Sequence, residues 1–170
     1  MRRIGQIVMM GGAYWTQHRE ANVTIDPEAA DTVFRSGIPI TAIGFEEARR
    51  TTVPLSTYEE APFAGSPLGA LYRAMAAGYS RAYGTESAVL YDVTAACVAV
   101  RPHWFTFEEV RVGVELHGRL SRGMTVVERD PVFNAVPDAV PLRIVNDHDA
   151  DAVLRLFSET VLQGAWPLPG

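Results

Sequence analysis

The fold of this chain is decided by Glu20-Ala21-Asn22-Val23-Thr24-Ile25-Asp26-Pro27-Glu28-Ala29-Ala30, which follows Met9-Met10-Gly11-Gly12-Ala13. The apolar run from Ile4 to Met10 stops at two glycines, as a buried strand does when it enters a loop. Asp26-Pro27 is typical of an N-cap and first helical residue, and Gly37 marks the expected helix end. We therefore expect Glu20 and Asn22 on the loop between strand and helix, a common place for ligands in α/β proteins.

The rest of the chain continues to alternate between apolar strands and amphipathic helices. Further strands are expected at 38–44, 110–116, 124–127 and 142–145, and further helices from Leu68 to Tyr79, from Val93 to Val100 and from an Asp149 cap to Gly164. The strands at 110–116 and 124–127 are predicted to form a hairpin. At 170 residues and 48% hydrophobic content, residues 1–170 are expected to form a single domain.

Charge and cysteine content exclude several classes of partner. The net charge of -5, with acidic and basic residues interspersed, argues against nucleic acid and against an anionic membrane. All 15 basic residues are arginine, which indicates a G+C-rich, bacterial genome. The single cysteine, Cys97, forms no internal disulfide and is expected to be buried in a helix. Together with the absence of a long apolar run, this predicts a soluble, cytoplasmic protein.

The opening motif and three later segments carry a family resemblance. The later segments are Ser36-Gly37-Ile38-Pro39-Ile40-Thr41, Leu90-Tyr91-Asp92 and the run Glu115-Leu116-His117-Gly118-Arg119-Leu120-Ser121-Arg122-Gly123-Met124-Thr125-Val126-Val127. In these segments the chain resembles the inosine/uridine-preferring nucleoside hydrolases, which hydrolyse the N-glycosidic bond of nucleosides. The resemblance implies the C-terminal part of that fold, a three-layer αβα arrangement around a mixed sheet. The family's N-terminal Asp-x-Asp-x-x-x-Asp-Asp motif is not found in the sequence.

The resemblance also implies roles for individual residues. Glu20 and Asn22 would bind ribose hydroxyls, with Asn22 beside the positive charge that develops on the sugar. Tyr91 stands where the family often has a proton-donating histidine, and Asp92 where it has its last calcium-binding aspartate. The alternatives are that Glu20 and Asn22 lie on a solvated loop, that Tyr91 only packs, and that Asp92 is a helix N-cap.

A calcium ion requires more ligands than this sequence offers. Calcium takes roughly six to eight oxygen ligands, and Asp92 alone remains from the family's set. The acidic run from Asp147 to Asp151 has a different spacing. The resemblance therefore implies Ca²⁺ only if another chain segment completes the site, and we expect the isolated chain to be inactive.

Aromatic residues are candidates for a nucleobase pocket. Trp15 and His18, together with Tyr14, precede Glu20 on the loop and are expected to shape the pocket. The tyrosines at positions 72, 79 and 83 follow helical spacing and are expected to pack instead. His103 and Trp104 are placed in a turn, and His117 in the hairpin.

Two functions remain open at this stage. The first is an N-ribohydrolase, or half of one, that acts on ribonucleosides once an N-terminal partner chain supplies the aspartate cluster. The second is a non-catalytic remnant that binds ribose or a nucleoside, or an interaction module. An uncovered sheet edge also predicts a homo-oligomer or a partner chain.

Overall fold

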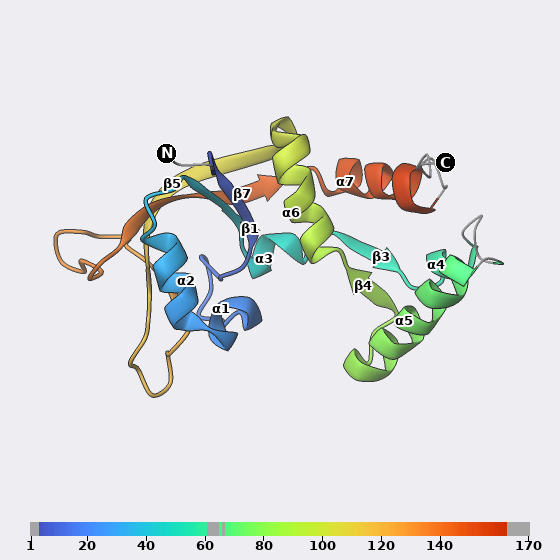
Figure 1. The fold of residues 1–170 in the computed structure, drawn as a ribbon, viewed down its shortest axis with the longest axis horizontal. Coiled ribbons are helices and arrows are strands. Elements are labelled where there is room, and N and C mark those ends of the chain that lie inside the picture. Colours follow the sequence, from blue (N-terminus) through green and yellow to red (C-terminus); the bar gives the residue numbers. More distant parts are fainter. Residues whose placement is uncertain (1–3, 61–64, 66, 163–170) are drawn as a thin grey trace.

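A five-stranded mixed sheet forms the centre of the fold (Figure 1) in the computed structural model, which describes residues 4–60, 65 and 67–162. The strand order is β1-β2-β7-β5-β6. The bounds are β1 Ile7–Met10, β2 Ile40–Ile43, β7 Val140–His148, β5 Phe105–Val114 and β6 Thr125–Val127. β1, β2 and β7 are parallel neighbours, whereas β5 pairs antiparallel with both β7 and β6. The mixed sheet and the predicted hairpin are thus confirmed.

Helices cover both faces of this sheet and complete the predicted three layers. The helices are α1 Ala21–Ile25, α2 Pro27–Phe34, α3 Phe45–Ala48, α4 Thr57–Glu60, α5 Pro67–Tyr83, α6 Tyr91–Val100 and α7 Ala150–Phe157. Alternate strand residues serve opposite faces. Ala42 and Ile144 pack with Phe34 of α2, while Ile43 and Val145 pack with the α6 and α7 side, where Cys97 is buried as predicted.

A second, smaller unit projects from the main sheet. β3 Thr52–Pro54 and β4 Ser87–Val89 pair antiparallel and lead out to α4 and α5 (Figure 1). Tyr58 of α4 stacks on Tyr72 of α5, with ring centroids 5.6 Å apart. The two-stranded sheet therefore holds α5 beside the carboxyl ends of β1 and β2, where it can border a site.

Several predicted boundaries are corrected by the structure. The strand expected at 110–116 begins at Phe105, and the one expected at 142–145 runs from Val140 to His148. The helix after Asp26 ends at Phe34, three residues before Gly37. On the helix expected from Leu68, Leu71 and Met75 are 56% and 59% exposed, so their spacing does not mark a buried face.

The short elements α1, α3, α4, β3 and β4 were not predicted. The final helix is capped by Asp149, whose carboxylate accepts the Ala152 N–H at 2.9 Å, and continues as a π-helical segment, Ser158–Leu162. The expected stop at Gly164 lies outside the described residues. His103 and Trp104 do form a turn, the 3₁₀ segment Pro102–Trp104.

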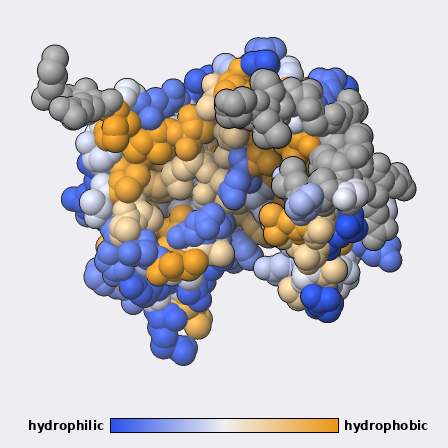
Figure 2. Space-filling view, turned by 45° about the vertical axis from the view of Figure 1, so that its right-hand side comes forward, coloured by the Kyte–Doolittle hydropathy of each residue, from blue (hydrophilic) through white to orange (hydrophobic). Residues whose placement is uncertain are grey.

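β1 lies at the edge of the sheet, where β2 is its one paired neighbour among the described strands. All four β1 residues are half-buried, and Ile4 before them is 54% exposed. Figure 2 shows a broad apolar area next to the N-terminal end of the chain. In the part of the chain that the structure describes, no helix has both the length and the apolar character needed to cross a membrane.

Candidate functional site

A pocket of about 590 Å³ lies beyond the carboxyl ends of β1 and β2, between the main sheet and α5. Five predicted site residues line it together: His18, Glu20, Asn22, Tyr91 and Asp92. The carboxyl end of a parallel sheet is where α/β proteins bind ligands. A second hollow of about 600 Å³ opens at the amino ends of the strands and contains none of the predicted residues. We therefore place the candidate site in the first pocket.

Glu20 lies at the start of a helix and not on a solvated loop. It is the N-cap of α1 and is 4% exposed. One carboxylate oxygen accepts the N–H of Asn22 at 2.8 Å, and the other accepts those of Gly12 and Val23 at 3.0 and 3.1 Å. A carboxylate has about four lone-pair positions, so one remains for a ligand.

Asn22 occupies the first turn of α1, with an exposed side chain at the pocket. Its amide nitrogen donates to the carbonyl oxygen and the sulfur of Met10, both at 3.3 Å. Because the amide nitrogen is turned back to β1, the carbonyl oxygen is the atom that the side chain offers to the pocket. Both residues were expected on a loop, and the short helix α1 corrects that expectation.

Tyr91 and Asp92 begin α6 and face the same pocket. Leu90 occupies the N-cap position, and among the described residues no side chain caps the helix, so the interpretation of Asp92 as an N-cap is wrong. Asp92 is exposed. Burial, followed by the nearby Tyr79, raises the pKa of Tyr91 above the usual tyrosine range. Near neutral pH the phenol is therefore protonated and acts as a hydrogen-bond donor.

Aromatic rings form a row along one wall of the pocket. Phe45 stacks between His18 and Tyr91, at centroid distances of 4.2 and 6.0 Å with both interplanar angles at 17°. The Phe45 N–H donates to the Gly12 carbonyl at 2.9 Å, which fixes the start of α3 against the glycine loop. The guanidinium of Arg49 lies 5.2 Å from the centre of the Phe45 ring.

A second aromatic wall comes from α5. Tyr79 and Tyr83 also line the pocket, and their ring centroids are 4.6 Å apart. Tyr83 is 71% exposed, so the expectation that Tyr79 and Tyr83 only pack is corrected. Tyr72 does pack, on Tyr58. The pocket thus lies between two sets of aromatic side chains.

Trp15 and Tyr14 are not brought to this pocket. The Arg129 guanidinium lies 4.1 Å from the Trp15 ring centre, on the other side of the loop. Tyr14 is buried beneath the loop, where burial raises its pKa, and its hydroxyl donates to the Gly11 carbonyl at 3.0 Å. Glu46 of α3 accepts the N–H groups of Tyr14 and Trp15 at 2.7 and 2.5 Å. These residues shape the loop from behind.

The described residues do not form a calcium site by themselves. Among them, no group of three or more His, Cys, Asp or Glu side chains is placed to hold a metal. The pocket contains two carboxylates, and that of Glu20 already accepts three main-chain N–H groups. Asp92 alone offers a free-standing carboxylate, far fewer than the six to eight oxygens that calcium takes.

Comparisons with known proteins point to one family over most of the chain. The family model described as inosine-uridine preferring nucleoside hydrolase matches residues 1–155. The pyrimidine-specific ribonucleoside hydrolases RihA of Citrobacter koseri and of Escherichia coli O9:H4 (strain HS) are 30% and 33% identical, over 93% and 92% of this chain but 53% and 52% of their own lengths. This chain therefore spans about half the length of the curated relatives that it matches.

Solved structures share the fold as well. A plant nucleoside hydrolase, PpNRh1, superposes with a TM-score of 0.78 at 25% identity, over 94% of this chain and 54% of that chain. A purine-preferring ribonucleoside hydrolase from Gardnerella vaginalis gives a TM-score of 0.75 at 29% identity, over 91% and 51% of the two chains. The similarity thus covers nearly all of this chain and half of each relative.

Proposed function

Since this chain belongs to the inosine-uridine preferring nucleoside hydrolase family, we propose that it supplies the ribose- and base-binding side of an N-ribohydrolase. The reaction is hydrolysis of the N-glycosidic bond of ribonucleosides to ribose and free base. The observation that carries this proposal is the pocket that brings His18, Glu20, Asn22, Tyr91 and Asp92 together. Residues 1–170 would act as part of a single domain, in a soluble cytoplasmic enzyme.

The sugar is assigned to the α1 side of the pocket. We assign Asn22 to the ribose and to the cationic transition state, because its carbonyl oxygen faces the pocket and partial negative charge stabilises developing positive charge. Glu20 is assigned to a ribose hydroxyl through its remaining acceptor position. Its other bonds hold Gly12 and Asn22 in place, so this carboxylate orients the site as well as contacting the sugar.

The base is assigned to the aromatic walls. A planar nucleobase fits between Phe45 and the tyrosines of α5, because aromatic rings favour stacked or tilted contacts with one another. Tyr91 can donate a hydrogen bond to the departing base, which is a weaker contribution than proton transfer by an acid with a pKa near neutrality. His18 adds a second polar group on the same wall.

The metal-binding side is assigned to another segment or chain. This chain contributes one ligand, Asp92, and the family's Ca²⁺ would be held mainly by aspartates from an N-terminal half or a partner chain. β1 is an edge strand with half-buried residues, which supports the addition of further strands there. A second copy of this chain would cover the edge but would not supply the missing aspartate motif.

Ribose release from inosine and uridine tests the proposal. The purified chain is assayed alone, and again with the N-terminal half of a family member that carries the aspartate motif, with calcium and then with chelator. We expect release only from the mixture, abolished by the chelator and reduced at least about 100-fold by Asn22→Ala. Release that continues in chelator, or a mixture that is inactive although the two chains form a complex, would contradict the proposal.

The alternative is a protein that binds ribose or a nucleoside without cleaving it. The observation that favours it is the lack of a metal-holding group among the described residues. Calorimetry with ribose and with inosine, in the absence of metal, distinguishes the two functions. Binding with no turnover in any mixture supports the alternative, whereas turnover by the mixture eliminates it.

A further inference from the structure

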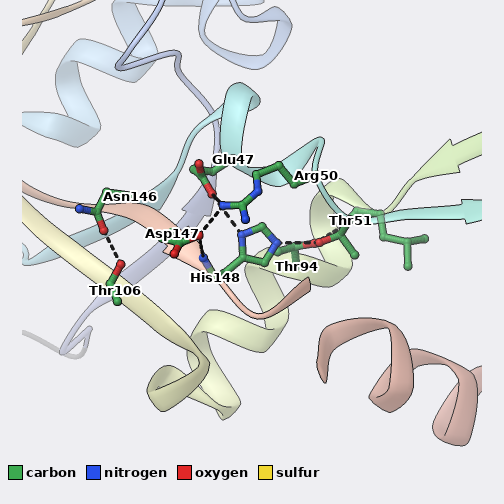
Figure 3. A network of polar contacts seen from close by, with 9 residues as sticks. Glu47, Arg50, Thr51, Thr94, Thr106, Asn146, Asp147 and His148 are labelled. Atoms are coloured by element: carbon green, nitrogen blue, oxygen red, sulfur yellow. Dashed lines mark hydrogen bonds and ion pairs between the residues drawn. The ribbon is translucent and has the colours of Figure 1, made fainter. Parts of the chain in front are cut away.

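A buried histidine lies behind the pocket and outside its lining. The ring of His148, at the end of β7, has no solvent exposure and stacks on Phe105 with 5.6 Å between ring centroids. Its Nε2 is 2.8 Å from the Thr51 hydroxyl, and its Nδ1 is 3.2 Å from a carboxylate oxygen of Glu47 (Figure 3). This imidazole therefore connects two segments that are far apart from β7 in sequence.

Both partners of the ring lead to the pocket. Glu47 belongs to α3, the helix whose first residue, Phe45, forms the centre of the aromatic wall. The carbonyl of Thr51 accepts the N–H of Leu90 at 2.9 Å, and Leu90 is the residue directly before Tyr91 and Asp92. A single side chain thus supports one wall of the pocket and the start of α6.

We propose that His148 is a positioning residue: by bonding Glu47 and Thr51 together, it fixes Phe45 and the α6 start, with Tyr91 and Asp92, in one arrangement. What these residues then act on rests on the proposed function, but the positioning itself is independent of it. His148 contacts neither the pocket nor any group assigned to the substrate.

The hydrogen-bond partners determine the form of the ring. A carboxylate accepts hydrogen bonds and cannot donate them, so Nδ1 carries the proton that is shared with Glu47. Nε2 of the neutral ring then accepts from the Thr51 hydroxyl. Burial lowers the pKa of His148, and the hydrogen bond to Glu47 opposes this with a smaller effect. The lowered pKa keeps the ring neutral near neutral pH.

Protonation of the ring would disturb this arrangement. With Nε2 protonated, the Thr51 hydroxyl must turn to accept, and its own hydrogen loses its acceptor in a residue that has no solvent exposure. The charged groups around the ring are Glu47, Arg50 and Asp147, and Arg50 bonds both carboxylates. The buried cluster around Phe105 and Cys97, which packs α6 against β7, adds two titratable groups, the Cys97 thiol and the Tyr91 phenol, and burial raises the pKa of both.

Amide hydrogen exchange of the whole, isotope-labelled chain tests the proposal. The readout is the protection factor of the Leu90 N–H, which bonds the Thr51 carbonyl and reports on the start of α6. Between about pH 7.5 and about pH 5 we expect this protection to fall about tenfold, and by more than the protection of amides in the centre of β7, which follows the global free energy of unfolding. Unchanged Leu90 protection would overturn the positioning role.

Two variants distinguish the effect of the His148 ring from that of the Thr51 hydroxyl. In His148→Leu we expect low Leu90 protection at both pH values. In Thr51→Val, which removes the hydroxyl and keeps the carbonyl, we expect the pH dependence of Leu90 to disappear. Thr52→Val and His117→Gln, both at exposed positions, are controls that should behave as the unmodified chain. A pH dependence that persists in Thr51→Val overturns the proposal, even where His148→Leu fails to fold.

The hydrogen exchange of Leu90 and the release of ribose test independent claims. Loss of Leu90 protection on protonation supports the positioning role whether or not the chain binds a nucleoside. Failure of ribose release would remove the proposed function and leave this result in place.

Discussion

The hydroxyl of Thr125 bonds both main-chain groups of Ala13, accepting its N–H at 2.9 Å and donating to its carbonyl at 2.7 Å. Thr125 and Ala13 are both buried and 112 residues apart. This pair fastens the β5–β6 hairpin to the loop that carries Gly12 and, further on, Glu20. The loop geometry of the pocket therefore depends on a distant strand.

Replacement of Thr125 by valine should be costly. Thr125→Val keeps the shape but leaves the Ala13 N–H and C=O buried without their partner. We expect a loss of about 2–4 kcal/mol in the free energy of unfolding, measured by urea denaturation. Thr106→Val is the control, because Thr106 bonds Asn146 at an exposed position, and it should cost less than about 1 kcal/mol. If the two variants lost the same free energy of unfolding, the buried bonds between Thr125 and Ala13 would not have the stabilising effect that we assign to them.

Gly12 is required for two separate reasons. Its φ is +79°, and an added Cβ would lie 2.8 Å from the Tyr14 ring and 3.0 Å from Thr125. Gly84 has a φ of +62° but open space around it. Gly84→Ala therefore measures backbone strain alone, expected at about 1 kcal/mol, whereas Gly12→Ala should cost about 3 kcal/mol. The difference between the losses of unfolding free energy in the two variants gives the effect of crowding against Tyr14 and Thr125. Equal losses would show that crowding does not contribute.

Sequence predicted those parts of the fold that carry local signals. Asp26 and Asp149 are common N-cap residues, and both accept the expected main-chain N–H, at 2.9 Å in each case. Glu20 is an unusual N-cap, so α1 was missed. The start of β5 was missed because a register irregularity between Thr106 and Phe107 breaks the alternation of strand residues.

The candidate site was predicted only in part, because only some of its residues carry a signal in the local sequence. Glu20, Asn22, Tyr91 and Asp92 were found because they belong to family motifs. Phe45 has a weak local signal, since it follows a strand end just as Glu20 does. Tyr79 and Tyr83 have none, because the projection of α5 depends on the pairing of β3 with β4 and not on the helix sequence.

Glu20 and Asn22 should respond differently to truncation. Glu20→Ala removes the acceptor of three N–H groups, two of them in buried hydrogen bonds, and should lower the free energy of unfolding by about 2–4 kcal/mol. Asn22→Ala, at an exposed position, should change it by less than about 1 kcal/mol. In the mixture of this chain with an N-terminal half that carries the aspartate motif, however, Asn22→Ala should reduce kcat at least about 100-fold. Urea denaturation and ribose release measure the two effects.

The control for this comparison is Asn146→Ala, another exposed amide that lies away from the pocket. It should leave both stability and ribose release nearly unchanged. If Asn22→Ala destabilised the chain as much as Glu20→Ala, its loss of activity would reflect unfolding, and the assignment of Asn22 to the sugar would lose its support.

His148 should also make global stability depend on pH. Burial lowers its folded-state pKa below the usual value of 6.5, so the unfolded chain binds the proton more tightly. The stabilisation from the neutral ring is therefore fully present above about pH 6.5 and is lost as the pH falls toward the folded-state pKa. Asp147, whose pKa is lowered by Arg50 from 3.8, acts in the same direction but at more acidic pH.

His148 and Asp147 titrate in separate pH ranges. The midpoints of urea denaturation between about pH 7.5 and about pH 5 therefore report on the titration of His148. The unmodified chain should lose stability steadily over this range, and His148→Leu should show a flatter profile, since leucine binds no proton. His103→Gln, at an exposed position, should keep the slope of the unmodified chain. If His148→Leu retained that slope as well, the proton would have to bind elsewhere, and the buried ring would not be the group that titrates.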